Sequence, residues 1–296
     1  MGLLRGGPIV SLARLQVRTV ATSRRRQLVA VYGVSLVGCV AVLVPLLWMV
    51  STALKTDKAV FSVPPQILPR SPTLSNLGTA TRLIPFWRYA TNSTVVAGLG
   101  SIGTVASAAL VAYPLARLRA PGLGVAFVLV LATMLLPQQV LLITQFLIFK
   151  RLGWYGTYLP LIVPSFLGGG AFNIFLLRQF FLTLSPELDQ AALLDGAGYW
   201  RIFWCIIVPQ SVPALVAVGI LDFVSKWNDF LGPLIYLNRT STYTLPLGLA
   251  SFRDVYDTAW NYLMVDTLLA VIPCVVLFFV AQRLLVRGLV VRGTKG

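Results

Sequence analysis

The chain has 296 residues, of which 57% are hydrophobic and 11% are charged. Because an average soluble domain carries about 25% charged residues, this composition excludes an ordinary soluble protein. Apolar runs of about 20 residues recur along the chain, and each is long enough to cross about 30 Å of hydrocarbon. A membrane β-barrel would show short alternating segments instead. The composition therefore predicts an all-α integral membrane protein.

The net charge is +15, from 24 basic and 9 acidic residues. In a soluble protein such an excess would indicate nucleic-acid binding. Here the basic residues mostly flank the apolar runs, as they do where positive charge sets membrane topology. We therefore interpret them as determinants of topology and as contacts with anionic membrane lipid. We expect no nucleic-acid partner.

The absence of histidine narrows the possible chemistry. It excludes a Ser-His-Asp triad, a Cys-His pair and any histidine-ligated metal. Cys39, Cys205 and Cys274 lie far apart and show neither a disulfide framework nor zinc spacing. The phosphate-binding pattern GxxxxGK[ST] is also missing, so the chain is not expected to hydrolyse ATP by itself. We expect a chain without a catalytic site, bound cofactor or metal.

Six membrane spans are predicted between residues 28 and 285. The basic segment 1–27 precedes them and is expected to be a cytoplasmic arm, although its arginine-rich composition also suits a cleaved transit peptide. Residues 286–296 form a basic tail, and the basic residues at both ends place both termini in the cytoplasm. The spans are expected at residues 28–54, 89–118, 123–149, 157–181, 212–237 and 262–285.

Two of the predicted spans contain residues that disturb a helix. Pro137 interrupts the third span and frees a backbone carbonyl, which Gln138 and Gln139 could satisfy unless they line a path through the protein. In the fourth span, the triple glycine at 168–170 permits either close helix packing or a local break.

A short polar segment at about residues 185–200 separates the fourth and fifth spans. Ser185 is a good helix cap, Pro186 suits the first helical position, and acidic residues occupy the first turn. The helix is expected to loosen at Gly196 or Gly198. The pattern predicts a surface helix parallel to the membrane, which either lies in the headgroups or presents a face to a cytoplasmic partner.

The stretch "QAALLDGAGYWRIFWCIIVP" resembles the EAA loop of ABC importer permeases. The spacing of the pattern is kept, with Gln190 in place of Glu and Val208 in place of Leu. In that family the loop is a coupling helix that docks into a cleft of a cytoplasmic ATPase. The resemblance implies coupling contacts from Gln190, Ala191, Ala192, Asp195, Gly196 and Ala197.

The wider resemblance covers about residues 89–296. The stretches "WNDFLGPLIYLN", "YTLPLGLASF" and "QRLLVRGLVVRGTKG" are similar to those of maltose-type carbohydrate permeases. This similarity implies the six-helix type I importer permease fold in a bacterial or archaeal plasma membrane. It also implies import of a sugar or oligosaccharide. The implied partners are a second permease, an ATPase dimer that binds ATP and Mg, and an extracytoplasmic solute-binding protein.

Three charged residues of the fifth predicted span share one helix face, since Asp222, Lys226 and Asp229 follow an i, i+4, i+7 spacing. Ionisable groups inside a membrane are costly and face either a partner or a cavity. One interpretation is a structural Asp222–Lys226 pair that seals a helix interface. The other is a polar wall of the translocation path, formed by Asp222, Lys226, Trp227, Asn228 and Asp229.

The polar loop before the sixth span is the last candidate region. In the resembled family it touches the solute-binding protein, which implies contacts from Tyr243, Leu245, Pro246, Ser251 and Phe252. The alternative is an ordinary connecting loop.

Three other functions stay open on the residues alone. The same fold could import a glycerol-phosphate ester, since Lys226 would favour an anion, whereas the neighbouring aspartates oppose one. A stand-alone secondary carrier would need an internal repeat and its own ion site, and no convincing repeat is visible. A membrane enzyme would have to rely on Asp or Lys chemistry.

Overall fold

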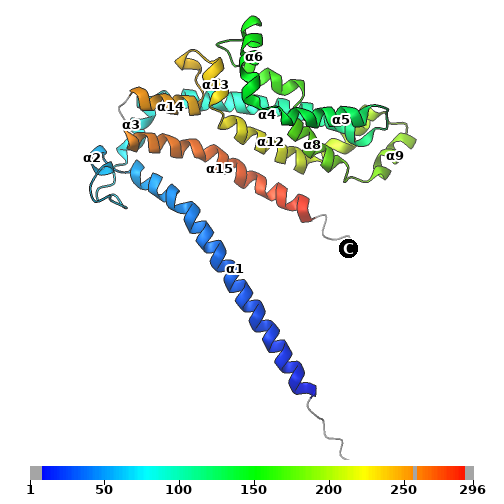
Figure 1. Ribbon diagram of the computed structural model, residues 1–296, viewed down its shortest axis with the longest axis horizontal. Coiled ribbons are helices and arrows are strands. Elements are labelled where there is room, and N and C mark those ends of the chain that lie inside the picture. The colour runs from blue at the N-terminus through cyan, green and yellow to red at the C-terminus, as the bar shows by residue number, and fades with distance from the viewer. Residues whose placement is uncertain (1–8, 256–258, 291–296) are drawn as a thin grey trace, which may run out of the picture. The chain divides into compact units, whose positions relative to one another are not determined.

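The computed structural model describes residues 9–255 and 259–290, and describes the side chains of residues 27–137, 139–250 and 259–282. The chain divides into two compact units, Met1–Thr73 and Leu74–Gly296, which are described separately. Throughout the described residues the regular structure is helical, without a β-strand (Figure 1).

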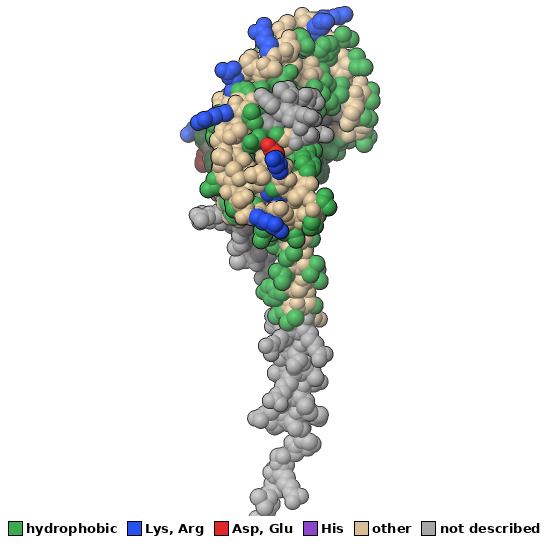
Figure 2. Space-filling view, turned by 90° about the vertical axis from the view of Figure 1, so that its left-hand side faces the viewer, with side chains coloured by type: hydrophobic (Ala, Val, Ile, Leu, Met, Phe, Trp, Pro, Cys, Tyr) green, Lys and Arg blue, Asp and Glu red, His purple; other side chains and the backbone are tan. Residues whose placement is uncertain are grey.

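The first unit consists mainly of the long helix α1 (Ile9–Ala53), which begins inside the segment expected to be an N-terminal arm. From Leu28 to Trp48 its large apolar side chains are exposed, and Figure 2 shows hydrophobic side chains along its described part. Such a surface suits lipid or another apolar helix rather than water. Beyond α1, a short helix α2 (Asp57–Val60) precedes a loop whose carbonyl at Gln66 accepts a hydrogen bond from the buried Lys55.

Helix α4 (Phe86–Arg117) is the centre of the second unit (Figure 1). It packs against α12 (Val212–Trp227) on one side and α8 (Ala171–Phe181) on another, and α15 (Trp260–Val290) packs against α12. The buried face of α4 is composed largely of Gly, Ala, Ser and Thr. Small residues let helix backbones approach closely where water supplies no hydrophobic driving force.

The fourth predicted span packs against this face of small residues on α4. It comprises α7 (Leu159–Ile162), the 3-10 helix η2 (Val163–Leu167) and α8, with a break at the triple glycine. A methyl group on Gly103 would lie 2.5 Å from the Phe166 ring. Gly169 has a φ of +67°, and a methyl group there would lie 2.5 Å from the backbone nitrogen of Ala108. The glycines therefore provide both the break and the close packing.

The other elements of the second unit connect and flank these helices. They are α3 (Ser75–Leu83), α5 (Leu123–Ala132), η1 (Thr133–Leu135), α6 (Gln138–Arg151), α9 (Pro186–Leu194), α10 (Tyr199–Ile202), the π-helix η3 (Phe203–Ile207), α11 (Val208–Gln210), α13 (Leu231–Tyr236), η4 (Thr240–Thr242) and α14 (Leu245–Val255).

The described residues contain four segments long and apolar enough to cross a membrane: Gln27–Ala53, Phe86–Arg117, Leu159–Phe181 and Trp260–Gln282. Two bent pairs raise the number to six if each pair is one span. One pair bends at the predicted Pro137 interruption, and the other joins Tyr199–Gln210 to Val212–Trp227 at an angle of 76°. The all-α architecture with up to six spans confirms the predicted fold class.

The predicted extent of the fifth span, 212–237, was wrong. Helix α12 ends at Trp227, and a separate helix α13 begins at Leu231. Asp229 lies in the break, where its Oδ1 accepts a hydrogen bond from the Gly232 backbone nitrogen at 3.2 Å. This side-chain contact satisfies a backbone donor that a continuous helix would have paired internally.

Candidate functional site

Two of the charged residues of α12 form an ion pair. The Lys226 ammonium donates to Oδ2 of Asp222 at 2.6 Å and to the Thr104 hydroxyl on α4 at 3.1 Å. The side chains of Lys226 and Asp222 are 21% and 11% exposed. The pair neutralises both charges and also joins α12 to α4. The predicted Asp222–Lys226 pair therefore forms, and it lies at the interface between α12 and α4.

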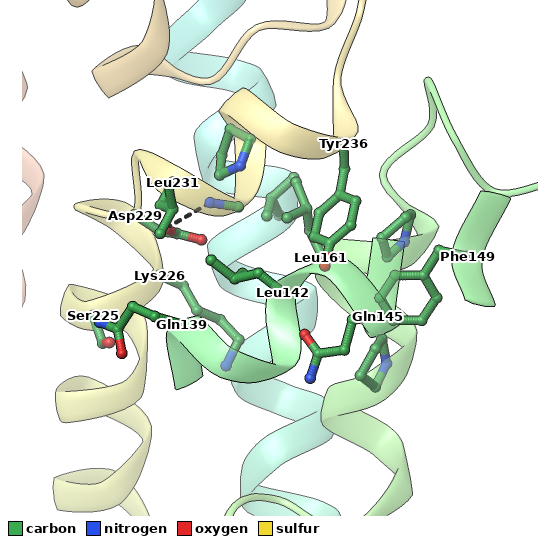
Figure 3. A pocket seen from close by; sticks show the side chains of 15 residues that line it. Gln139, Leu142, Gln145, Phe149, Leu161, Ser225, Lys226, Asp229, Leu231 and Tyr236 are labelled. Atoms are coloured by element: carbon green, nitrogen blue, oxygen red, sulfur yellow. Dashed lines mark hydrogen bonds between the residues drawn. The ribbon is translucent and has the colours of Figure 1, made fainter. Parts of the chain in front are cut away.

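A polar cavity of about 410 Å³ adjoins the pair. Lys226 and Asp229 line it from the α12 side, and Gln139 and Gln145 line it from α6 (Figure 3). Figure 3 places the side chains of Lys226, Gln145 and Tyr236 on different sides of this space. The cavity is also lined by Val96, Leu142, Phe149, Pro160, Leu161, Pro164, Ser225, Leu231, Gly232 and Pro233.

The chemistry of this cavity suits hydroxyl-rich ligands. Amide side chains both donate and accept hydrogen bonds, and the Asp229 carboxylate accepts them. Phe149 and Tyr236, whose ring centroids are 5.3 Å apart, add aromatic surface against which an apolar face of a ligand can pack. A mixture of polar groups on an aromatic wall is typical of ligand sites.

The structure separates the five residues that were expected to form a polar wall. Trp227 is only 3% exposed and donates from Nε1 to the Ala270 carbonyl on α15 at 3.1 Å. Asn228 donates to the Val224 carbonyl of its own helix at 2.8 Å. Both line a different space, of about 290 Å³, between α12, α14 and α15. Asp222 reaches the polar cavity only through its pair with Lys226.

Several residues that line the cavity were not predicted from the sequence. Lining a path was one of two roles predicted for Gln138 and Gln139, and no role was predicted for Gln145, Ser225 or Tyr236. Gln145 lies six residues beyond Gln139 on α6, which is about 1.7 turns, so the two amides do not share one helix face and the helical period gave no signal that linked them.

The short helix α9 forms where the sequence predicted a surface helix. Ser185 caps it by accepting a hydrogen bond from the Glu187 backbone nitrogen at 3.3 Å. The helix ends at Leu194, and Gly196 follows with a φ of +78°. This conformation is the left-handed ending that glycine permits at low cost.

The six predicted coupling residues divide into two groups. Gln190, Ala191, Asp195 and Gly196 are exposed. Ala192 is buried in a core cluster with α4 and α8, and Ala197 packs against the same cluster. The helix therefore has one face anchored in the protein and one face free within this chain.

The predicted outer-loop contacts also divide. Leu245 is 1% exposed, and its backbone nitrogen donates to the Ser93 hydroxyl at 2.7 Å, so it belongs to the core instead of the surface. Asn92 on α4 donates to the Tyr243 carbonyl at 2.9 Å and holds the loop. Tyr243 and Pro246 are half-buried, and the side chains of Ser251 and Phe252 lie outside the described residues.

Comparison with known proteins gives the family. Residues 105–291 match the family model described as "Binding-protein-dependent transport system inner membrane component". The chain is 36% identical over 262 residues to "Probable ABC transporter permease protein YurM" of Bacillus subtilis (strain 168), covering 87% of this chain and 85% of that protein. It is 33% identical over 263 residues to "sn-glycerol-3-phosphate transport system permease protein UgpE" of Escherichia coli (strain K12), covering 86% of this chain and 93% of that protein.

A solved structure supports the fold independently. The chain superposes with a TM-score of 0.75 and 22% identity on a chain of a "bacterial ABC transporter involved in the import of the acidic polysaccharide alginate", covering 88% of this chain and 97% of that one. The family match covers α9 and every residue that lines the cavity except Val96. The chain therefore belongs to the family of inner-membrane permease components of binding-protein-dependent ABC importers.

Proposed function

We propose that the chain translocates a neutral sugar or oligosaccharide through the polar cavity beside Lys226 and Asp229. The observation that carries this proposal is the lining of the cavity by amides, a carboxylate and aromatic rings. These groups match a ligand with many hydroxyls and apolar ring faces.

The charges in and beside the cavity favour a neutral ligand over a glycerol-phosphate ester. Lys226 could attract a phosphate, but its ammonium already lies 2.6 Å from Asp222. Asp229 then leaves an excess negative charge at the wall. An anionic ligand would meet repulsion there, and it would lose its own hydration shell on entering.

We further propose that α9 docks onto a separate ATPase dimer and transmits its closure to the membrane-spanning helices. Its free face carries the small residue Ala191, and the small residue Gly196 follows the end of the helix, so a partner can approach closely. Leu194 beside them is 89% exposed, as expected for a residue that a partner covers. This assignment places α9 and both termini on the cytoplasmic side. A second permease would complete the pathway, and a solute-binding protein would deliver the substrate from the other side.

The test is purification of the tagged chain from its native membrane in mild detergent, with mass spectrometry of the proteins that accompany it. We expect an ATPase, a second permease and a solute-binding protein. Thermal shifts of that binding protein with neutral sugars, acidic oligosaccharides and glycerol phosphates then identify the ligand class. A chain that purifies alone and still transports after reconstitution would establish a secondary carrier instead. A binding protein stabilised only by glycerol phosphates would overturn the neutral-sugar assignment.

A further inference from the structure

Arg117, the last residue of α4, connects three parts of the chain. Its Nε donates to Oδ2 of Asp189 on α9 at 2.8 Å. Its Nη1 donates to the carbonyls of Phe181 and Leu184, at 3.3 and 2.9 Å, and its Nη2 donates to the carbonyl of Ser185 at 2.9 Å. One guanidinium therefore holds the end of α8, the turn after it and the first half of α9.

This set of contacts depends on the shape of arginine. The carbonyls at the end of a helix lack partners within the helix, and a cation there is favoured by the helix dipole. Arginine has five donors in a rigid planar fork, whereas lysine has three donors on one nitrogen and cannot span separate acceptors in the same way. The Arg117 side chain is only 6% exposed, so its contacts are shielded from competing water.

A second arginine reinforces the same junction from the opposite side. Arg178 on α8 donates from Nε to the Leu115 carbonyl near the end of α4 at 3.0 Å. Its guanidinium also lies 4.0 Å from the centroid of the Phe127 ring on α5. The ends of α4 and α8 are thus joined in both directions, and among the described residues it is Arg117 whose side chain extends a hydrogen bond from α4 to α9.

The other functional contact of α4 lies at Thr104, which accepts a hydrogen bond from the Lys226 ammonium at the cavity. Thr104 and Arg117 are separated by about 20 Å along one helix, at 1.5 Å per residue. Helix α4 is continuous between these two residues, although Pro114 removes one backbone hydrogen bond near its end, so a displacement of that end is conveyed along the helix. Helix α4 therefore joins the capped end of α9 to the ion pair beside the cavity.

We propose that Arg117 is the positioning residue that makes α4 follow α9, so that movement of α9 reaches Lys226 through α4 as well as through α8. This inference rests on the proposed coupling role of α9. Arg117 does not touch substrate; it acts by holding Asp189 and the α8–α9 turn against the end of α4.

The experiment uses the complete complex in proteoliposomes. Cys39, Cys205 and Cys274 are replaced by alanine, and Ser225→Cys places a single reporter thiol in the cavity lining. The rate of modification by methanethiosulfonate ethyltrimethylammonium is measured without nucleotide and with MgATP plus vanadate, together with ATP hydrolysis. The variants are Arg117→Lys, Asp189→Asn and Asp189→Ala. Arg119→Lys is the matched control, since Arg119 is exposed two residues further along.

We expect nucleotide to change the modification rate in the parent and in Arg119→Lys. In Arg117→Lys this change falls by at least about threefold, a typical size for loss of a coupling contact, while ATP hydrolysis is retained. Asp189→Asn retains an acceptor for Nε of Arg117, so we expect it to lose less of the nucleotide response than Asp189→Ala. If the Arg117 contacts only stabilise the fold, the variant would form less complex, and the complex that does form would keep the full nucleotide response.

An undiminished nucleotide response in Arg117→Lys overturns the proposal. If that variant does not assemble, the same comparison is made with Asp189→Ala, which removes only the side-chain contact to α9; an undiminished response there overturns it equally. A parent that hydrolyses ATP without any change in the reporter rate rejects the coupling role of α9 itself, and the inference about Arg117 fails with it.

Discussion

Gly100 and Lys226 meet where α4 and α12 cross. A methyl group on Gly100 would lie 2.6 Å from Cε and 2.7 Å from Cδ of Lys226. Carbon atoms in favourable contact are about 3.5 to 4.0 Å apart, so the lysine stem occupies the space that any side chain at Gly100 would need. The missing side chain is what lets Lys226 pass over α4 and reach both Thr104 and Asp222.

Gly100→Ala should therefore displace Lys226. We expect the substitution to destabilise the protein by about 1 to 3 kcal/mol, the usual range for overpacking, and to reduce transport. Gly98→Ala is the matched control, because it lies on the same helix with no atom within 4 Å of the added methyl group. The measurements are thermal unfolding of the purified complex and transport by proteoliposomes. Equal behaviour of the two variants would contradict the crossing described above.

The Asp222–Lys226 pair should show strong coupling between its members. Removing one partner leaves a partly buried charge uncompensated, so Lys226→Met and Asp222→Asn should each destabilise the protein by about 1 to 3 kcal/mol. The double variant should be less destabilised than the sum of the two, because it leaves no charge behind. A double-mutant cycle in thermal or denaturant unfolding measures this difference. Strict additivity would show that Asp222 and Lys226 do not stabilise each other.

Asp229 has two roles that substitution can separate. Asp229→Asn keeps an oxygen to accept the Gly232 backbone hydrogen but removes the charge at the cavity. We expect it to change the substrate concentration that gives half-maximal transport, with assembly unaffected. Asp229→Ala also removes the acceptor and should cost about 1 kcal/mol of stability in addition. If the alanine variant only lost the complex, and the asparagine variant transported normally, Asp229 would be structural alone.

Gly196→Asp should uncouple transport from ATP hydrolysis. Gly196 has a φ of +78°, where a residue with a β-carbon is disfavoured by about 1 kcal/mol, and it is exposed beside the free face of α9. Asparagine tolerates this conformation and has nearly the size of aspartate, so Gly196→Asn isolates the effect of the added charge. The measurements are membrane abundance, ATP hydrolysis and transport. Normal transport by Gly196→Asp at normal abundance would reject the docking role.

Local features of the structure were predictable from the sequence. The capped helix after Ser185 and its ending near Gly196 follow from cap chemistry that acts within a few residues. The Asp222–Lys226 pair follows from an i, i+4 spacing on one helix. Close packing and a break around Gly169 follow from the small size and backbone freedom of glycine.

Features that depend on contacts between distant segments could not be predicted from the sequence. The spacing of Trp227 and Asn228 did not reveal that they face α15 rather than the cavity, because the face that a helix buries is chosen by the neighbours that pack on it. The contribution of Gln145 from α6 was hidden for the same reason. The end of α12 at Trp227 was also not predicted, although the Asp229–Gly232 contact at this break is local.

The sequence by itself thus determined the membrane character, the approximate spans and the capped surface helix, since composition, hydrophobic length and cap residues act locally. Only the tertiary structure decided which polar side chains share a cavity and that Arg117 joins α4 to α9, since these contacts lie between residues as far apart as Arg117 and Asp189. Such pairings are set by the packing of whole helices, and that packing depends on all of their faces at once.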